Sequence, residues 1–263
     1  MLWDINAWPA DDRRRIVGVF TDIDDTLTTD GRATPDALLA LARLKSAGLH
    51  VIPITGRPAG WSAPFAAVWP VDTIVAENGS VALTHPAGGA LVKRYQQDEA
   101  TRTRNFARMQ DVALRVLREV PGAQLSRDSI GRETDIAIDH SEFNHMDASA
   151  IARAVRIMQA EGMTATVSSI HINGWYGTHN KLEGARWIVR ELFGRDLDAE
   201  SDRWVYVGDS TNDQLMFEHF ANSIGVANIR RFERELAHKP RYITRGERGE
   251  GFAEVSVKLL AVR

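Results

Sequence analysis

In Phe20-Thr21-Asp22-Ile23-Asp24-Asp25-Thr26-Leu27-Thr28, a hydrophobic strand runs directly into a group of carboxylates. Residues 16–20 form a continuous apolar run, which is typical of a strand buried on both faces. A second apolar run, at 204–207, leads into Gly208-Asp209-Ser210-Thr211-Asn212-Asp213. Open α/β sheets bind their ligands at the carboxyl ends of such strands. We therefore expect both carboxylate groups at one sheet edge, where their mutual repulsion favours a bound cation such as Mg²⁺.

The composition is that of an ordinary globular protein and excludes several classes. The chain has 263 residues, 44% hydrophobic and 25% charged, which suits one large domain or two small ones. A net charge of -3 gives no indication of a nucleic-acid partner. The absence of cysteine excludes disulfides, thiolate metal sites and a cysteine nucleophile, and it fits a reducing compartment.

No part of the sequence predicts a membrane protein or an exported one. No apolar run approaches the ~20 residues that a membrane span needs. The first nine residues lack the basic start and apolar stretch of a signal peptide. We expect a soluble, cytoplasmic protein without a membrane partner, whose oligomeric state the sequence does not reveal.

The order of expected elements indicates a parallel sheet interrupted by an insert. Up to residue 76, strands alternate with helices, which is the signature of a parallel sheet with crossover connections. These elements are strands at 16–23, 50–54 and 73–76, and helices at 35–47 and 61–68.

The pattern then changes to an α+β block. We expect a hairpin at 81–95 turning at 86–89, helices at 103–119 and 148–159, a strand at 134–139 and one or two strands within 165–176. The polar–apolar alternation at 134–139 predicts a half-exposed antiparallel strand. After the block we expect helices at 181–193, 213–220, 231–237 and 251–261, strands at 204–208, 223–226 and 242–244, and a loop at 246–251.

We therefore predict an α/β fold: a Rossmann-like, parallel-sheet core with an inserted α+β cap domain. The core is discontinuous and comprises residues 1–82 and 178–263, and the cap comprises residues 83–177.

Asp22 and Asp24 lie two residues apart, so in an extended segment they share one face. Asp22 can attack phosphorus and form an aspartyl phosphate. Asp24 can give a proton to the leaving oxygen and later take one from water. A solvated turn that contains several acids is the alternative explanation.

Asp209 and Asp213 stand four residues apart after Gly208, which permits a tight turn off the strand. Asp209 can bind a cation directly, and Asp213 can hold the cation or its waters from the next helical turn. Helix capping by Asp209 or Ser210, with Asp213 favouring the helix dipole, is the alternative.

Two further segments suggest phosphate contacts. Around Thr55 and Gly56, a hydroxyl and backbone N–H groups at a helix amino terminus can hold phosphate oxygens, although a threonine there is also a common cap. Lys181 opens a helix, where its charge is unfavourable for the dipole. It can neutralise the nucleophile and the transferring phosphoryl group, although a lone lysine is most often solvated.

Other motifs are absent or weak. No Gly-x-x-x-x-Gly-Lys motif predicts a nucleotide-binding loop. The eight histidines show no metal-ligand spacing, and we expect His140, His171 and His179 at the surface or at caps.

Together and in this order, these pieces resemble the four motifs of the haloacid dehalogenase superfamily. The Asp-x-Asp-x-Thr motif corresponds to residues 22–26, the second motif to Thr55, the third to Lys181 and the fourth to residues 208–213. One departure is Asp25, where many relatives have glycine.

The resemblance implies roles for the matching residues. Asp22 would be the nucleophile and Asp24 the acid and base. Mg²⁺ would be bound by the Asp22 carboxylate, the Asp24 backbone carbonyl and Asp209, with Asp213 in support.

The insert lies between the second and third motifs, which is similar to a type II cap of the B subclass. Residues 76–80 and 249–252 are also similar to that subclass. Its members include sucrose-phosphate, trehalose-phosphate and mannosyl-phosphoglycerate phosphatases, broader sugar phosphatases and phosphomannomutases. The resemblance implies a Mg²⁺-dependent phosphatase for a small phosphorylated metabolite, for which we expect a sugar phosphate.

The cap would read the substrate. Its candidates are Arg127, Arg132 and Glu133, together with His171 and Asn173, and ordinary solvated side chains are the alternative. A phosphomutase, which returns the phosphoryl group to the sugar, is a second hypothesis. A non-catalytic binding protein is a third, and the intact motif residues disfavour it.

Overall fold

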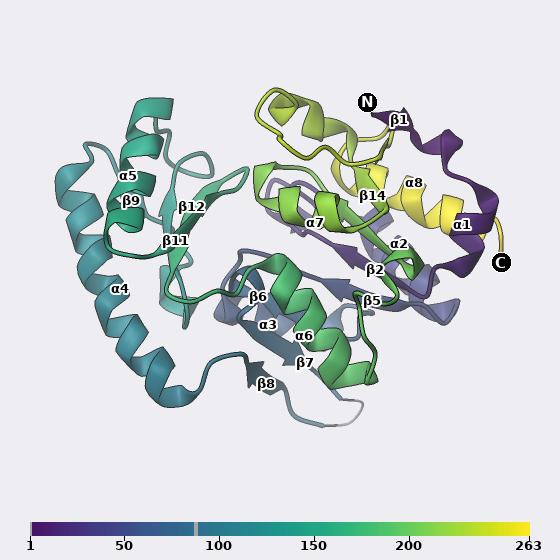
Figure 1. Ribbon diagram of the computed structural model, residues 1–263, viewed down its shortest axis with the longest axis horizontal. Helices are drawn as coiled ribbons and strands as arrows, with labels where there is room; N and C mark the ends of the chain where they lie inside the picture. Colours follow the sequence, from purple (N-terminus) through teal and green to yellow (C-terminus); the bar gives the residue numbers. More distant parts are fainter. Residues whose placement is uncertain (1, 87–88) are drawn as a thin grey trace.

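The computed structural model describes residues 2–86 and 89–263, and its centre is a six-stranded parallel sheet (Figure 1). The strand order is β1 (Trp3–Asp4), β15 (Tyr242–Ile243), β14 (Asn222–Gly225), β13 (Trp204–Gly208), β2 (Gly18–Thr21) and β5 (His50–Pro53). The predicted parallel α/β fold is therefore confirmed. The two strands that lead into the carboxylates, β2 and β13, are direct neighbours.

Helices cover both faces of this sheet, which explains the continuous apolar runs. In β2, Val19 packs into one hydrophobic cluster and Phe20 into the other. In β13, Val205 and Tyr206 divide between the two clusters in the same way. One face is covered by α2 (Pro35–Ser46) and α8 (Arg248–Leu260), and the other by α6 (Lys181–Phe193) and α7 (Gln214–His219). The short α1 (Ala10–Arg15) packs near α8.

A three-stranded sheet continues from the edge of the parallel one. Ile54, just after β5, bridges to Val75 in β6 (Ile74–Ala76). The predicted hairpin forms β7 (Val81–Thr84) and β8 (Val92–Tyr95), which add to β6 in antiparallel fashion, beside α3 (Ala59–Val68). Residues 87 and 88 of its turn lie outside the described residues.

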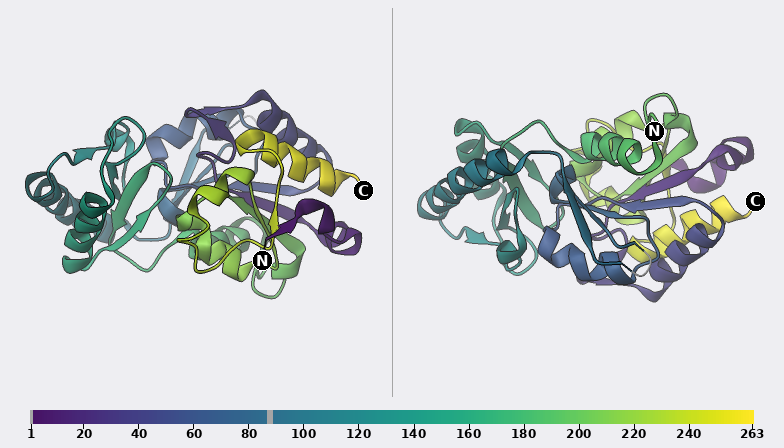
Figure 2. Two further views of the ribbon diagram at one scale, coloured as in Figure 1. Left: turned by 90° about the horizontal axis from the view of Figure 1, so that it is seen from above. Right: turned by 90° about the horizontal axis from the view of Figure 1, so that it is seen from below.

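A separate antiparallel sheet lies to one side of the parallel sheet, and two long helices cover its outer face (Figure 2). Its strand order is β11 (Thr164–Val167), β12 (His171–Trp175), β10 (Ile136–Asp139) and β9 (Gln124–Leu125). The helices are α4 (Glu99–Glu119) and α5 (Ala148–Ala160), and they share a hydrophobic cluster with the sheet. We call this sheet and its two helices the cap. The domain limits at residues 83 and 177 stay a prediction.

Three local predictions are wrong. The strand at 134–139 is not half-exposed, because all four residues of β10 are buried between the helices and the rest of the chain. No α-helix forms at 231–237: a 3₁₀ helix spans Ala227–Phe232, where the side chain of Asn228 bonds to the Asp25 carbonyl and to the Arg248 amide. Residues 248–251 are the first turn of α8 rather than a loop.

Within the part of the chain that the structure describes, every helix is too short or too polar to span a bilayer.

Candidate active site

The ends of β2 and β13 bring the predicted carboxylates together. The backbone amide of Asp22 donates to the carbonyl of Val207 at 2.8 Å, which locks the end of one strand to the other. Oxygens of Asp22, Asp209 and Asp213 all lie within 4.8 Å of one another, and all three residues are buried. This cluster is the candidate active site.

Lys181 lies between two of these carboxylates. Its Nζ is 3.0 Å from Asp22 Oδ1 and donates to Asp213 Oδ1 at 2.7 Å. Asn180 caps the helix by accepting from the Glu183 amide, which sets Lys181 at the first turn and aims it at the site. Burial lowers the pKa of the Lys181 ammonium, but Asp213 and Asp22 more than offset this and raise it above its usual range. The lysine is therefore a fixed positive charge beside Asp22.

Both oxygens of the Asp213 carboxylate are occupied by hydrogen bonds from neighbouring groups of the site. Its Oδ2 accepts from the amides of Asp209 at 2.9 Å and Ser210 at 3.1 Å, while Oδ1 accepts from Lys181 and from the hydroxyl of Tyr206. Gly208 is needed because a Cβ there would lie 2.4 Å from Asp213 Oδ2. With four donors on its carboxylate, Asp213 holds the backbone of Asp209 and the Lys181 ammonium in place.

Asp209 has the surroundings of a cation ligand. Its Oδ2 accepts from Asn228 at 3.0 Å, whereas the buried Oδ1 has no hydrogen-bond partner among the described residues. Burial raises the pKa of Asp209 well above its usual range, and repulsion from Asp213 and Asp22 adds to this. A buried carboxylate oxygen beside other carboxylates costs free energy unless a cation pairs with it. These oxygen donors suit Mg²⁺, so the residues fit the expected metal.

Burial also raises the pKa of the Asp22 carboxyl, although Lys181 partly offsets the effect. The positive charges of Lys181 and of a bound cation would both favour the ionised form that a nucleophile needs.

Thr55 and Gly56 follow β5 at the same edge of the parallel sheet. The Thr55 hydroxyl accepts from the Arg57 amide at 3.0 Å. The Gly56 carbonyl accepts from Arg132 at 3.0 Å, which ties this loop to the cap. The loop is therefore held between the sheet and the cap.

Arg57 belongs to this site, although the sequence analysis assigned it no role. Its guanidinium is buried and donates from Nε to Asp24 Oδ2 and from Nη2 to Asp24 Oδ1, both at 2.9 Å. It also reaches two cap carboxylates, with Nη1 3.1 Å from Asp128 and Nη2 2.7 Å from Glu142. One core arginine thus joins Asp24 to the cap. Its place two residues after Thr55 was the available signal.

A cavity of ≈ 260 Å³ opens beside this arginine. Core and cap both contribute walls. Its lining residues are Asp24, Asp25, Thr28, Asp30, Gly31, Arg57, Ser141, Glu142, Phe143, Ile170 and Arg248.

The cap candidates are placed differently from one another. Arg132 is buried, pairs with Asp135 at 2.7 Å and reaches the Gly56 carbonyl, close to the site but not in the cavity lining. Asn173 contacts Asp135 as well. The Glu133 side chain accepts from Lys93 and Tyr95 and is not part of the cavity lining. The Arg127 guanidinium stacks 3.9 Å from the ring of Phe143, a cavity residue.

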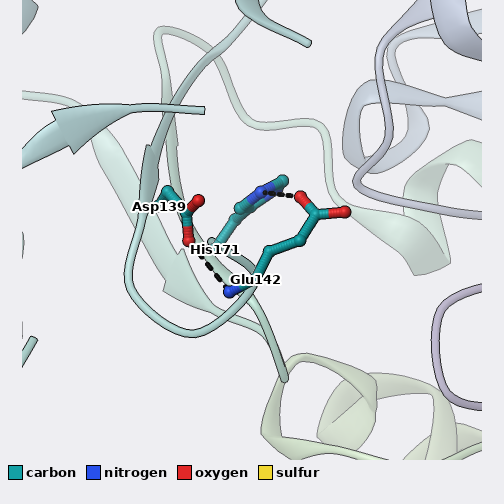
Figure 3. Close-up of side chains that lie close together, drawn as sticks. All are labelled: Asp139, Glu142 and His171. Atoms are coloured by element: carbon teal, nitrogen blue, oxygen red, sulfur yellow. Dashed lines mark hydrogen bonds and ion pairs between the residues drawn. The ribbon is translucent and has the colours of Figure 1, made fainter. Parts of the chain in front are cut away.

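The expectation of surface histidines is wrong, because His140, His171 and His179 are all buried. His171 is the first residue of β12, and His140 directly follows β10, where its ring nitrogens bond to the Ser141 hydroxyl and the Ser168 carbonyl. Figure 3 shows His171 beside Asp139 and Glu142, with its Nε2 2.9 Å from Glu142 Oε2. Glu142 is a second residue that sequence reasoning missed, since nothing in its local pattern places it against the core.

Comparison with known proteins identifies the same class of fold. Residues 19–120 match the family model of haloacid dehalogenase-like hydrolases. The sequence matches no curated protein.

Solved structures share the whole architecture. The sucrose-phosphatase of Synechocystis sp. PCC6803 is 15% identical, with a TM-score of 0.65, 92% of this chain covered and 97% of that one. The trehalose-6-phosphate phosphatase C-terminal domain of C. albicans is 13% identical, with a TM-score of 0.70 and coverages of 99% and 98%. A HAD/COF-like hydrolase of Plasmodium vivax is 15% identical, with a TM-score of 0.69 and coverages of 97% and 100%. At these identities the likeness shows the fold alone.

Proposed function

We propose that this chain, whose residues 19–120 match the family model of haloacid dehalogenase-like hydrolases, is a Mg²⁺-dependent phosphomonoesterase that acts through an aspartyl phosphate. The observation that carries the proposal is Lys181 Nζ, 3.0 Å from Asp22 Oδ1 in a buried cluster with Asp209 and Asp213. Phosphoryl transfer depends chiefly on positioning and on positive charge, and the cluster supplies both to Asp22.

In the first proposed step an Asp22 oxygen attacks phosphorus, and the bond from phosphorus to the leaving oxygen breaks. Asp24, two residues along the chain, gives its carboxyl proton to that oxygen. Lys181 offsets the charge of Asp22 and of the phosphoryl oxygens. The Thr55 hydroxyl and the backbone amides near Gly56 hold the same oxygens.

In the second step water attacks the phosphorus of the aspartyl phosphate. Asp24 takes the proton of the water, the bond from phosphorus to Asp22 breaks, and inorganic phosphate leaves. The Asp22 carboxylate, the Asp24 backbone carbonyl and Asp209 would hold Mg²⁺, with Asp213 in support. The metal supplies positive charge that offsets the phosphoryl oxygens when it is bound.

We propose a sugar phosphate as the substrate class. The cavity beside Asp24 is lined by carboxylates, a serine and two arginines, which suit the hydroxyl groups of a polyol. A sucrose-phosphatase is among the solved structures that share this fold, which makes sugar phosphates the first compounds to test. We assign residues 83–177 to a substrate-reading cap domain, with Arg127, Arg132 and Glu133 as its candidates, and place the enzyme in the cytoplasm.

The test is phosphate release from a panel of sugar phosphates and other phosphorylated metabolites, with and without Mg²⁺. Asp22→Asn, which keeps the shape of the side chain, is the matched control. We expect release that needs both Mg²⁺ and Asp22. Release that survives in Asp22→Asn, or none from any compound, would contradict the proposal. Transfer of phosphate between positions of one hexose would indicate a mutase instead.

A further inference from the structure

Glu142 is held rigidly by the cap. It follows β10, and Asp139 at the end of that strand accepts from three successive amides: Ser141 at 3.2 Å, Glu142 at 2.9 Å and Phe143 at 3.0 Å. His171 pairs with Asp139 across β10 and β12, so the sheet places both residues beside Glu142 (Figure 3). The cap backbone therefore fixes where the Glu142 carboxylate points.

Both oxygens of Glu142 accept from Arg57 of the core, Oε1 from Nη2 at 2.7 Å and Oε2 from Nη1 at 3.3 Å. Oε2 also lies 2.9 Å from His171 Nε2 within the cap. The Glu142 side chain is only 16% exposed, so the contact is largely shielded from solvent. Glu142 thus links the cap sheet directly to the loop after β5.

Arg57 also bonds to Asp24, so it connects Glu142 with that carboxylate. A guanidinium is a rigid plane with its donors in a fixed fork, so fixing one edge fixes the other. The edge formed by Nε and Nη2 holds both oxygens of Asp24, while Glu142 and Asp128 of the cap hold the remaining donors. Without the cap, Arg57 would keep Asp24 as its one carboxylate partner in this cluster.

We propose that Glu142 is a positioning residue, which fixes the proton-donating Asp24 through Arg57 when the cap is closed. The inference rests on the proposed function, because it takes Asp24 to be the general acid of that reaction. Closure would then complete the catalytic arrangement only when the substrate is enclosed, as in other enzymes whose lids assemble the site.

A metal site is the alternative role for these residues, because one atom each of Asp139, Glu142 and His171 lies within 4.8 Å of the others. Their oxygens already have partners, however. Asp139 accepts from three amides, and Glu142 faces the Arg57 guanidinium, which would repel a cation. The contacts therefore favour a positioning role.

The test uses two esters of similar shape that differ in how much they need a proton. Phenolate leaves poorly and gains from general acid catalysis, whereas 4-nitrophenolate leaves readily without a proton. We would measure kcat/KM for phenyl phosphate and 4-nitrophenyl phosphate, because kcat/KM reports the first phosphoryl transfer and not the later hydrolysis. Glu142→Gln removes the charge and keeps the shape, and Glu142→Ala removes any hydrogen bond that glutamine retains.

General acid catalysis typically contributes 10²–10⁴-fold, so loss of positioning should cost about tenfold or more on phenyl phosphate. We expect less than about threefold on 4-nitrophenyl phosphate, where little of that contribution is at stake. The matched control is Glu161→Gln, which removes a cap carboxylate paired with Arg115 and should leave both values unchanged. Unfolding midpoints of all variants show that they remain folded.

The outcomes separate the two proposals. If kcat/KM falls equally on both esters, Glu142 only holds the cap in place. If kcat/KM stays unchanged on both esters in Glu142→Gln and in Glu142→Ala, Glu142 does not act on Asp24. Both results overturn the inference and leave the phosphatase intact, provided that the unmodified chain hydrolyses the esters and Asp22→Asn does not. A chain that is silent on both esters overturns the proposed function and the inference with it.

Discussion

His179 should make the protein lose stability as the pH falls from neutrality. It stands two residues before Lys181, is 3% exposed, and neither ring nitrogen has a hydrogen-bond partner among the described residues. Its ring stacks on Trp175, with 5.5 Å between the ring centroids and 24° between the planes. Burial lowers the pKa of His179 from 6.5 to about 4, because an imidazolium would lose its hydration there.

The sign and size of the effect follow from that pKa. The unfolded chain takes up a proton near pH 6.5, whereas folded His179 does so only near pH 4. The stabilisation is therefore fully present above about pH 6.5 and is lost as the pH falls through this window. Each pH unit costs up to about 1.4 kcal/mol, so the loss approaches about 3 kcal/mol at pH 4 and about 2 kcal/mol at pH 5.

The assay is urea unfolding at pH 7 and pH 5, with a chelator present so that metal binding does not contribute. We compare the unmodified protein with His179→Phe, which keeps an aromatic ring beside Trp175. Between the two pH values the unmodified protein should lose about 2 kcal/mol more than the variant. The difference at pH 7 measures packing alone. Equal losses would contradict this explanation, since they would mean that His179 accepts its proton equally well in the folded and the unfolded chain.

Three further predictions concern the sheet, the site and the cap. Gly18→Ala should lower the thermal midpoint, with a cost of about 1–3 kcal/mol from overpacking, because its Cβ would lie 2.2 Å from the Trp204 ring. Asp213→Asn should abolish phosphate release and lower the urea midpoint by the equivalent of about 3–5 kcal/mol, because Lys181 loses a buried carboxylate partner. Burial tends to raise the pKa of Glu142, but its histidine and arginine partners lower it from 4.5 to about 2. Its contribution to stability should therefore be present above pH 4.5 and decline towards pH 2, and Glu142→Gln should weaken that decline in thermal unfolding.

The core of the fold could be predicted from the sequence because its strands carry an unambiguous pattern. A strand covered by helices on both faces must be apolar at every position, as residues 16–20 and 204–207 are. The strand at 134–139 misled for the complementary reason. Its polar residues alternate with apolar ones, yet both of its aspartates are buried. Asp135 bonds to Asn173, far along the chain, whereas Asp139 accepts from the amides of the loop that follows the strand.

The candidate site divides in the same way. Asp22 and Asp209 follow adjacent strands, so chain topology alone brings them to one edge of the sheet. Arg57 and Glu142 lie 85 residues apart, and their contact depends on how the cap sits on the core. No local pattern specifies that placement, so the link between cap and core could be recognised only in the folded structure.

Asp25 shows how a departure in sequence can be accommodated. Its φ of 53° lies in the left-handed region, which glycine adopts most readily. Aspartate is among the few other residues that tolerate this region. Its carboxylate is 3.0 Å from Arg248 Nε, and its carbonyl accepts from Asn228, which also binds Asp209. The extra acid therefore has an arginine beside it and a backbone tied through Asn228 to Asp209, so its charge is balanced at the cavity wall.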